Sequence, residues 1–379
     1  MVGLSQSNNK PTVGMKHLMT TIWLLGCTSL SVAQAPTKTN PASERVEVTV
    51  HPGIELFTVV QVLAGQYPTP NKSTYVKDVE RHFGSFTNHP AVEYARKMGR
   101  LYTDVAELGY CFDNFPNVRV HFPEKLSWYD RYGRDTVQTY MKLCRQFYDE
   151  SNFWDFYQQH RADYAAWSRQ VYDDLMKKGL VAKLDSFYRF TSKAQWSVYM
   201  DPLNSWGAHA IMPKNLNPRY SDRVVYNVGY FNRESKDTDV PVFSLGSESV
   251  NLVWHEGSHI YTHNLQQQYA AQIEKLAYLL NKEDAGMARN NISTWSHCFD
   301  ENLVRGVVIA LFRQHLTPKE ARKQAAREIV SDFLYAGDIA DVIQTRYLND
   351  DKQKDFSAFF PNILAYLTKK YPQSQLSNR

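Results

Sequence analysis

Two histidines four positions apart, with a glutamate directly after the first, occur at His255, Glu256 and His259. On an α-helix, side chains at positions i and i+4 share one face, so both imidazoles can direct a nitrogen to one point. Imidazole nitrogens are common zinc ligands, and the adjacent glutamate is then placed to take a proton from a water molecule. The pattern therefore predicts one zinc ion per chain, with His255 and His259 as ligands and Glu256 as general base.

A catalytic zinc site needs a third protein ligand and an open fourth position. His263 continues the same helix face, but it lies a further turn along a straight helix, too far from the same ion. Glu301 is the better candidate, because it stands at the acidic start of a strongly apolar segment that is typical of a buried helix. Asp300 and His297 remain alternatives for the third ligand.

Hydrolysis of an acyl bond also needs a hydrogen-bond donor for the oxyanion that develops on the attacked carbonyl. Tyr347, in the helix-like segment DVIQTRYLND, and His297 are the candidate catalytic donors. Tyr261 and His209 are further alternatives. These four residues are proposed from their types and positions along the chain.

The elements that must position these residues can be read from hydrophobic periodicity. Helical spacing returns from about Ser247 and persists to the C-terminus, which places the histidine pair on a helix. Short strands are predicted before it, at 196–200, 208–212, 224–231 and 240–245. The strand at 224–231 or 240–245 could present an edge that pairs with an extended peptide.

The first half of the chain is predicted to be mainly helical. Residues 45–51 alternate as a strand, whereas 54–64, 75–83 and 91–108 have helical spacing. Residues 136–188 form a long helical tract whose aromatic residues recur at steps of three and four, which indicates packing between helices. The predicted fold class is α+β, mostly α-helical, with a zincin-like site and a small sheet before the histidine-bearing helix.

One domain is predicted over residues 45–379. It comprises a helical half at 45–190, a strand-rich middle at 191–246, and the helices that carry the site at 247–379. Residues 34–44 are polar and contain proline, which is typical of a flexible tether.

Residues 1–33 are predicted to be an upstream extension and a secretory signal peptide. From Met15 the chain has a basic start, an apolar stretch and then small residues. Cleavage after Ser31-Val32-Ala33 would release the protein, whereas Leu24-Leu25-Gly26-Cys27 resembles a lipobox that would leave a lipid anchor on Cys27. An uncleaved leader is the third alternative. The first two interpretations predict export, to the periplasm, the cell surface or the medium.

Composition limits the remaining classes of function. The chain is 43% apolar and 13% aromatic, which is typical of a globular protein with a large core or a groove. A net charge of +4 without a basic run argues against nucleic acid as a partner. No segment after the leader offers the roughly 18 apolar residues of a membrane span. The three later cysteines, Cys111, Cys144 and Cys298, are too few for a disulfide framework.

Four segments carry a resemblance to a known family: IELFTVVQVLAGQYPTPNKSTYVKDVERHFGSFTNHPAV, DESNFWDFYQQHRADYAAW, WHEGSHIYTHN and FDENLVRGVVIALF. Together they resemble exported bacterial proteins, common in Bacteroidetes, that are catalogued as domain of unknown function 4932. The resemblance covers most of residues 45–370. It implies a zinc metallopeptidase in which His255 and His259 bind the ion, Glu256 is the base and Glu301 is the third ligand.

One position departs from thermolysin-like proteases, which place an aspartate one turn after the glutamate ligand to orient a histidine. That position is Arg305 here. Arg305 is therefore expected to pair with Glu301 or Asp300, or to meet a carboxylate of the substrate.

Three functions are compatible with these residues. The first is an exported zinc peptidase that acts on a peptide or protein substrate. The second is a non-catalytic surface protein that binds peptide or glycan. The third is a zinc hydrolase of a different acyl bond, because the same constellation activates water for any acyl carbon.

Overall fold

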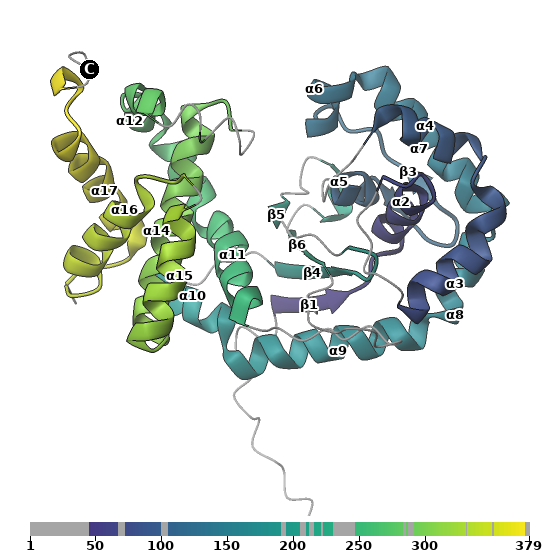
Figure 1. Cartoon of the computed structure of the whole chain (residues 1–379), viewed down its shortest axis with the longest axis horizontal. Coiled ribbons are helices and arrows are strands. Elements are labelled where there is room, and N and C mark those ends of the chain that lie inside the picture. Colours follow the sequence, from purple (N-terminus) through teal and green to yellow (C-terminus); the bar gives the residue numbers. More distant parts are fainter. Residues whose placement is uncertain are drawn as a thin grey trace, which may run out of the picture. The chain divides into compact units, whose positions relative to one another are not determined.

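Four of the described strands form one sheet, in the spatial order β1-β4-β6-β5 (Figure 1). Strands β1 (Val46–Thr49), β4 (Gln195–Asp201) and β6 (Arg223–Gly229) run parallel, and the two-residue strand β5 (Ala210–Ile211) pairs antiparallel with β6. Strand β4 is buried along nearly its whole length, as expected for a strand covered on both faces. Of the two edges predicted, the strand at 224–231 is covered by β5 at Val225 and Tyr226, and the strand at 240–245 lies outside the described residues.

The computed structural model describes residues 45–66, 73–99, 105–190, 195–204, 210–211, 216–220, 223–229, 247–282, 286, 292–330, 332–350 and 352–375. The predicted leader, the tether at 34–44 and the strand at 240–245 lie outside these residues. Residues 40–379 form one compact unit. In the described part of the chain, no helix combines the length and the apolar composition that crossing a membrane requires.

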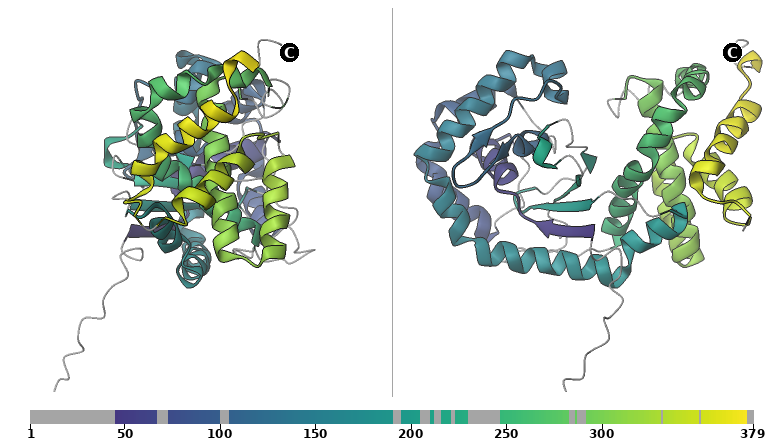
Figure 2. Two further views of the ribbon diagram at one scale, coloured as in Figure 1. Left: turned by 90° about the vertical axis from the view of Figure 1, so that its left-hand side faces the viewer. Right: turned by 180° about the vertical axis from the view of Figure 1, so that it is seen from behind.

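Helices dominate the chain before β4. They are α2 (Pro52–Leu63), α3 (Thr74–Phe83), α4 (Pro90–Met98), α5 (Val105–Tyr110), α6 (Ser127–Tyr132), α7 (Arg134–Glu150), α8 (Phe153–Gln159), α9 (Arg161–Lys178) and α10 (Leu180–Tyr188). A short hairpin, β2 (Phe112–Asp113) with β3 (Arg119–Val120), lies between α5 and α6. Helix α9 packs along β1, at the edge of the sheet opposite β5 (Figure 2).

Two predicted helical tracts are divided in the structure. The tract at 91–108 becomes α4 and α5, because Gly99 ends α4 with a φ of +82°, a left-handed conformation that glycine adopts without strain. The tract at 136–188 lies within α7 to α10. Asn152 and Gly179, with φ of +52° and +59°, precede α8 and α10.

A second group of helices follows the sheet. It consists of α11 (Ser247–Gln268), α12 (Ala270–Glu274), α14 (Trp295–His315), α15 (Pro318–Val330), α16 (Ala336–Val342) with a π-helical turn (Ile343–Tyr347), and α17 (Phe356–Lys370). Helix α14 packs against α11, α15 and α16. The mostly α-helical α+β fold predicted from the sequence is confirmed.

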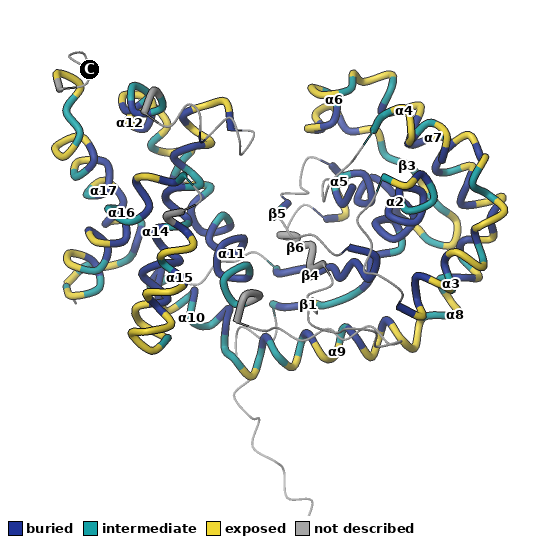
Figure 3. Tube along the Cα trace, in the orientation of Figure 1, coloured by how far each residue is buried: buried dark blue, intermediate teal, exposed yellow. Residues whose placement is uncertain are grey.

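Most aromatic residues of the 136–188 tract belong to the core, and Figure 3 shows buried stretches alternating with exposed ones along α7 and α9. Phe147 and Phe153 are fully buried, and Trp167 is 6% exposed. Their rings contact those of α3: Phe147 and Phe153 lie within about 6 Å of Phe83. Cys111, Cys144 and Cys298 are buried free thiols, as predicted.

Candidate metal centre

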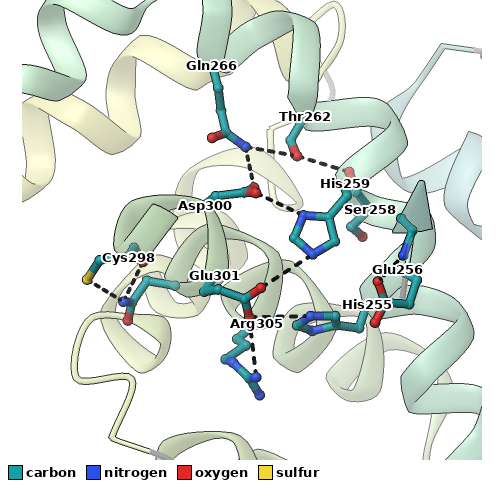
Figure 4. A network of polar contacts seen from close by, with 12 residues as sticks. His255, Glu256, Ser258, His259, Thr262, Gln266, Cys298, Asp300, Glu301 and Arg305 are labelled. Atoms are coloured by element: carbon teal, nitrogen blue, oxygen red, sulfur yellow. Dashed lines mark hydrogen bonds and ion pairs between the residues drawn. The ribbon is translucent and has the colours of Figure 1, made fainter. Parts of the chain in front are cut away.

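The two histidines and Glu301 converge on one point between α11 and α14. His255 Nε2 lies 3.5 Å from Glu301 Oε2, and His259 Nε2 lies 3.7 Å from Glu301 Oε1. Figure 4 shows the two imidazoles and the carboxylate pointing toward one another. One ligand atom from each of the three residues lies within 4.8 Å of the other two. The structure therefore brings together the three ligands that the sequence predicted.

This group fits a zinc ion in both its atoms and its spacing. Two imidazole nitrogens and one carboxylate oxygen form a donor set of catalytic zinc sites. Bonds of about 2.0–2.1 Å in a tetrahedral site place ligand atoms roughly 3.4 Å apart, close to the separations observed here. The side chains of His255, His259 and Glu301 are 11%, 18% and 16% exposed, so the group retains contact with solvent.

Close packing of α11 against the sheet explains the glycine inside the motif. A Cβ atom at Gly257 would lie 2.4 Å from the ring of Trp196 on β4 and 2.7 Å from Leu184 on α10. The neighbouring Trp254 is buried and donates its indole N–H to the carbonyl of Leu180 at 3.3 Å. These contacts seat the histidine-bearing helix against α10 and β4.

Helix α14 presents Glu301 from a capped and buried segment. The Thr294 hydroxyl accepts the backbone N–H of His297 at 3.3 Å, which caps the helix. From Leu303 to Phe312 the helix is buried at nearly every position, as its apolar sequence predicted. The acidic residues therefore stand in the first two turns of a helix whose position is fixed by packing.

Asp300 meets the other nitrogen of His259. Its Oδ2 lies 3.1 Å from His259 Nδ1, whereas Glu301 faces Nε2 of the same ring. The second oxygen, Oδ1, accepts a hydrogen bond from the Gln266 side-chain amide. Asp300 is therefore not among the converging ligand atoms, and the alternative that it is the third ligand has no support from this geometry.

Arg305 pairs with Glu301 and with a second buried glutamate. Its Nη2 donates to Glu301 Oε2 at 3.3 Å, and its Nη1 donates to Glu328 Oε2 at 2.6 Å. Asn251, one turn before His255, donates to the other oxygen of Glu328 at 2.7 Å. Of the roles predicted for Arg305, the structure supports the pairing with Glu301.

Electrostatics favour the charged forms of His259 and Glu301. Burial lowers the pKa of His259, but Asp300, Glu301 and Glu256 outweigh burial and raise that pKa to about 10. Burial raises the pKa of Glu301, yet His255, His259 and Arg305 together hold it below its usual range. A metal ion must displace the proton from His259, so its binding is expected to release a proton and to weaken at low pH.

Glu256 is held by the backbone of the edge strand. The N–H of Ala210 on β5 donates to Glu256 Oε2 at 2.8 Å, and Glu256 is 7% exposed. One carboxylate oxygen is thereby fixed, which orients the predicted base beside His255. The sequence did not indicate this contact, because a backbone donor leaves no signal in residue type.

The residues predicted as oxyanion donors lie in different surroundings. Tyr347 is fully buried and its hydroxyl donates to the carbonyl of Phe187 at 2.6 Å, so the structure does not place it at the metal centre. Tyr261 donates to Asp185 at 2.7 Å. His297 is exposed and lies one turn before Glu301 on α14. His209 lies outside the described residues.

Comparison with known proteins adds a family but no activity. The sequence model of a family described as domain of unknown function (DUF4932) matches residues 130–366, which include α11 and α14. The resemblance expected over most of 45–370 thus begins later, at α6. No curated protein and no solved structure matches the chain. Because the match spans more than half of the sequence, the chain belongs to the family of the domain of unknown function (DUF4932).

Proposed function

We propose that the protein is an exported zinc-dependent peptidase. The observation that carries the proposal is the convergence of His255, His259 and Glu301 beside a glutamate whose carboxylate is fixed in place. A purely structural ion site would be expected to close its coordination with a fourth protein ligand. Among the described residues three side chains converge, and the carboxylate of Glu256 is the proposed base.

The residues divide the chemistry between them. Zinc, when bound, supplies Lewis acidity and makes water a stronger acid. Glu256 takes the proton from the attacking water and passes it to the leaving amine as the peptide bond breaks. His297 is the described candidate that is exposed to solvent near Glu301, and it could donate a hydrogen bond to the oxyanion. Tyr347 is left out of this scheme because its hydroxyl is engaged in the interior.

Strand β5 supports a peptide as substrate over other acyl compounds. The N–H of Ala210 points toward Glu256, and in a strand the carbonyl of the same residue points to the same side. The Ala210 carbonyl can therefore accept an N–H from an extended chain lying along this edge. Such pairing selects backbone amides, which esters and most small acyl compounds do not offer.

Export is proposed from the leader sequence alone. The basic start, apolar stretch and small residues between 15 and 36 support it. Cleavage before Gln34 would release the protein, and lipidation of Cys27 would anchor it at the surface. Intact-mass measurement of the mature protein distinguishes these two outcomes.

The test of the proposed activity compares the wild type with Glu256→Gln on a mixed peptide library read by mass spectrometry. The variant should retain zinc and lose about 10²–10⁴-fold in hydrolysis, the typical contribution of a general base. Glu274→Gln, at an exposed position on α12, is the matched control and should keep full activity. Undiminished hydrolysis by Glu256→Gln would show that Glu256 is not the base.

Further assays of the same wild-type protein distinguish the peptidase from the two other functions. Cleavage of activated esters without any cleavage of peptides would favour a hydrolase of another acyl bond. Zinc binding without hydrolysis of either class would favour a non-catalytic binding protein.

A further inference from the structure

We propose that Asp300 is the positioning residue of the metal centre, acting through His259 and not on the ion. This inference rests on the zinc site proposed above and adds a role for a residue outside the ligand set. It concerns the orientation and the tautomer of one imidazole ring. The carboxylate that performs this task immediately precedes the ligand Glu301.

The geometry of the ring supports this role. A neutral imidazole carries one N–H, and an ionised carboxylate can only accept. Asp300 Oδ2, 3.1 Å from Nδ1 of His259, therefore holds the proton on Nδ1. When a metal ion has displaced the second proton of the ring, the lone pair of Nε2 is directed to the point where the ligand atoms converge, with Glu301 Oε1 3.7 Å away. A carboxylate on the second nitrogen of a metal-binding histidine fixes the ring and raises its basicity.

Asp300 is itself held by a chain of hydrogen bonds along α11. Gln266 donates its amide to Asp300 Oδ1 and to the Thr262 hydroxyl, the latter at 3.3 Å. Thr262 is fully buried and donates to the carbonyl of Ser258 at 3.1 Å. Both oxygens of Asp300 are thus engaged, one by the ring it orients and one by an amide anchored to the same helix (Figure 4).

Helical geometry explains why two adjacent acids can do different tasks. Successive residues on a helix point about 100° apart. Glu301 accordingly faces the Nε2 atoms of both histidines, while Asp300 reaches around to Nδ1 of His259. Arg305, one turn after Glu301, has no acceptor for an imidazole N–H and binds two carboxylates.

The test measures zinc affinity by competition with a chromophoric chelator in the full chain. Asp300→Ala should weaken zinc binding 10–100-fold, the usual effect of removing a partner of a metal-binding histidine. Gln266→Leu, which frees Asp300 without touching a ligand, should weaken it by a smaller factor. Asp163→Asn is the matched control, because Asp163 Oδ2 also lies 3.1 Å from a histidine Nδ1, that of His160. It should leave zinc affinity unchanged.

Two spectroscopic measurements distinguish positioning from a general loss of stability. In the zinc-loaded wild type, ¹H–¹⁵N correlation of the histidine rings should show His259 protonated at Nδ1, and Asp300→Ala should lose this single tautomer. The visible absorption of the cobalt-substituted protein should change in Asp300→Ala and not in Asp163→Asn. Apo-protein unfolding curves show whether each variant is folded.

The outcomes separate this inference from the proposed function. Wild-type protein that binds zinc, together with Asp300→Ala and Gln266→Leu variants of equal affinity and unchanged spectra, would overturn the role of Asp300 and leave the zinc site standing. An Asp300→Ala variant that does not fold shifts the decision to Gln266→Leu, whose unchanged affinity and spectrum would overturn the role equally. A folded wild type without zinc affinity would overturn both proposals.

Discussion

Glu301 on α14 and Glu55 on α2 are both buried glutamates, yet their surroundings favour opposite protonation states. Burial raises the pKa of both residues. At Glu301, His255, His259 and Arg305 outweigh burial and hold the pKa below its usual range. At Glu55, which is 1% exposed, the nearby Asp201 raises the pKa further, against a smaller opposing effect of the Tyr75 hydroxyl.

Burial alone does not make a glutamate part of a cation site. Around Glu55 the structure places tyrosine hydroxyls and a second acid, with Tyr75 bonded both to Glu55 and, at 2.6 Å, to Tyr164. Two neighbouring buried acids are stable when one of them keeps a proton. Around Glu301 the neighbours include the imidazoles of His255 and His259, whose nitrogens can bind a metal ion in place of a proton. The same residue type therefore belongs to a buried hydrogen-bond network in one region and to a group that could hold a metal ion in the other.

The largest difference between Glu301 and Glu55 is expected when each is replaced by glutamine. Glu301→Gln should reduce zinc affinity by more than about 100-fold, because a direct ligand should matter more than an outer partner. Glu55→Gln should leave zinc affinity unchanged. Titration of both variants against the same chelator measures the effect. Equal affinities for the two variants would remove Glu301 from the ligand set and return attention to His297 and Asp300.

A substitution on the buried side of α11 tests the packing of this helix, whereas the preceding substitutions test charge. Gly257→Ala should lower the free energy of unfolding by about 1–3 kcal/mol, because the added methyl group meets Trp196 and Leu184 in a filled space. Gly84→Ala is the control, since nothing lies within 4 Å of its Cβ position. Urea unfolding of the apo-proteins measures both. A Gly257→Ala protein as stable as the Gly84→Ala protein would contradict close packing of α11 on β4.

The smallest expected effect is a difference in pH dependence. Because the folded pKa of Glu55 is raised, its contribution to stability is complete below its unfolded pKa and is lost as pH rises through the folded value. Glu301 has a lowered pKa, so its contribution is present above its unfolded pKa and is lost as pH falls. Glu55→Gln should remove the loss of stability that Glu55 causes as pH rises. It should change the free energy of unfolding near neutral pH by about 1 kcal/mol.

The measurement is chemical unfolding of wild-type and Glu55→Gln apo-proteins from mildly acidic to alkaline pH, because the slope begins above the unfolded pKa of Glu55. The wild type should lose stability relative to the variant as pH rises. Parallel curves for the two proteins would show that Glu55 is not protonated in the folded state.

Much of the candidate site could be predicted because its residues obey local rules. His255 and His259 are four residues apart on one helix, and Glu301 stands in a segment whose apolar run indicates a buried helix. These signals depend on periodicity within a single element. The strands β4 and β6 were predicted for the same reason.

The features of the site that could not be predicted depend on contacts between elements that are distant in the sequence. The two-residue strand β5 is too short to define an edge from sequence, and its bond to Glu256 uses a backbone N–H. Asp300 was predicted only as an alternative ligand or as a partner of Arg305, because the sequence does not show which imidazole nitrogen a carboxylate faces. The spacing of Ser258, Thr262 and Gln266 at four-residue steps was the available signal for the polar chain that holds Asp300.

The most direct test of the account is the zinc content of the purified protein. Wild-type protein prepared without chelator, supplied with zinc and then desalted, should contain about one zinc per chain by mass spectrometry, and His259→Ala should contain almost none. Glu55→Gln, prepared in the same way, should match the wild type. A folded wild type without zinc, or a His259→Ala variant with the same zinc content as the wild type, would contradict a metal centre at His255, His259 and Glu301.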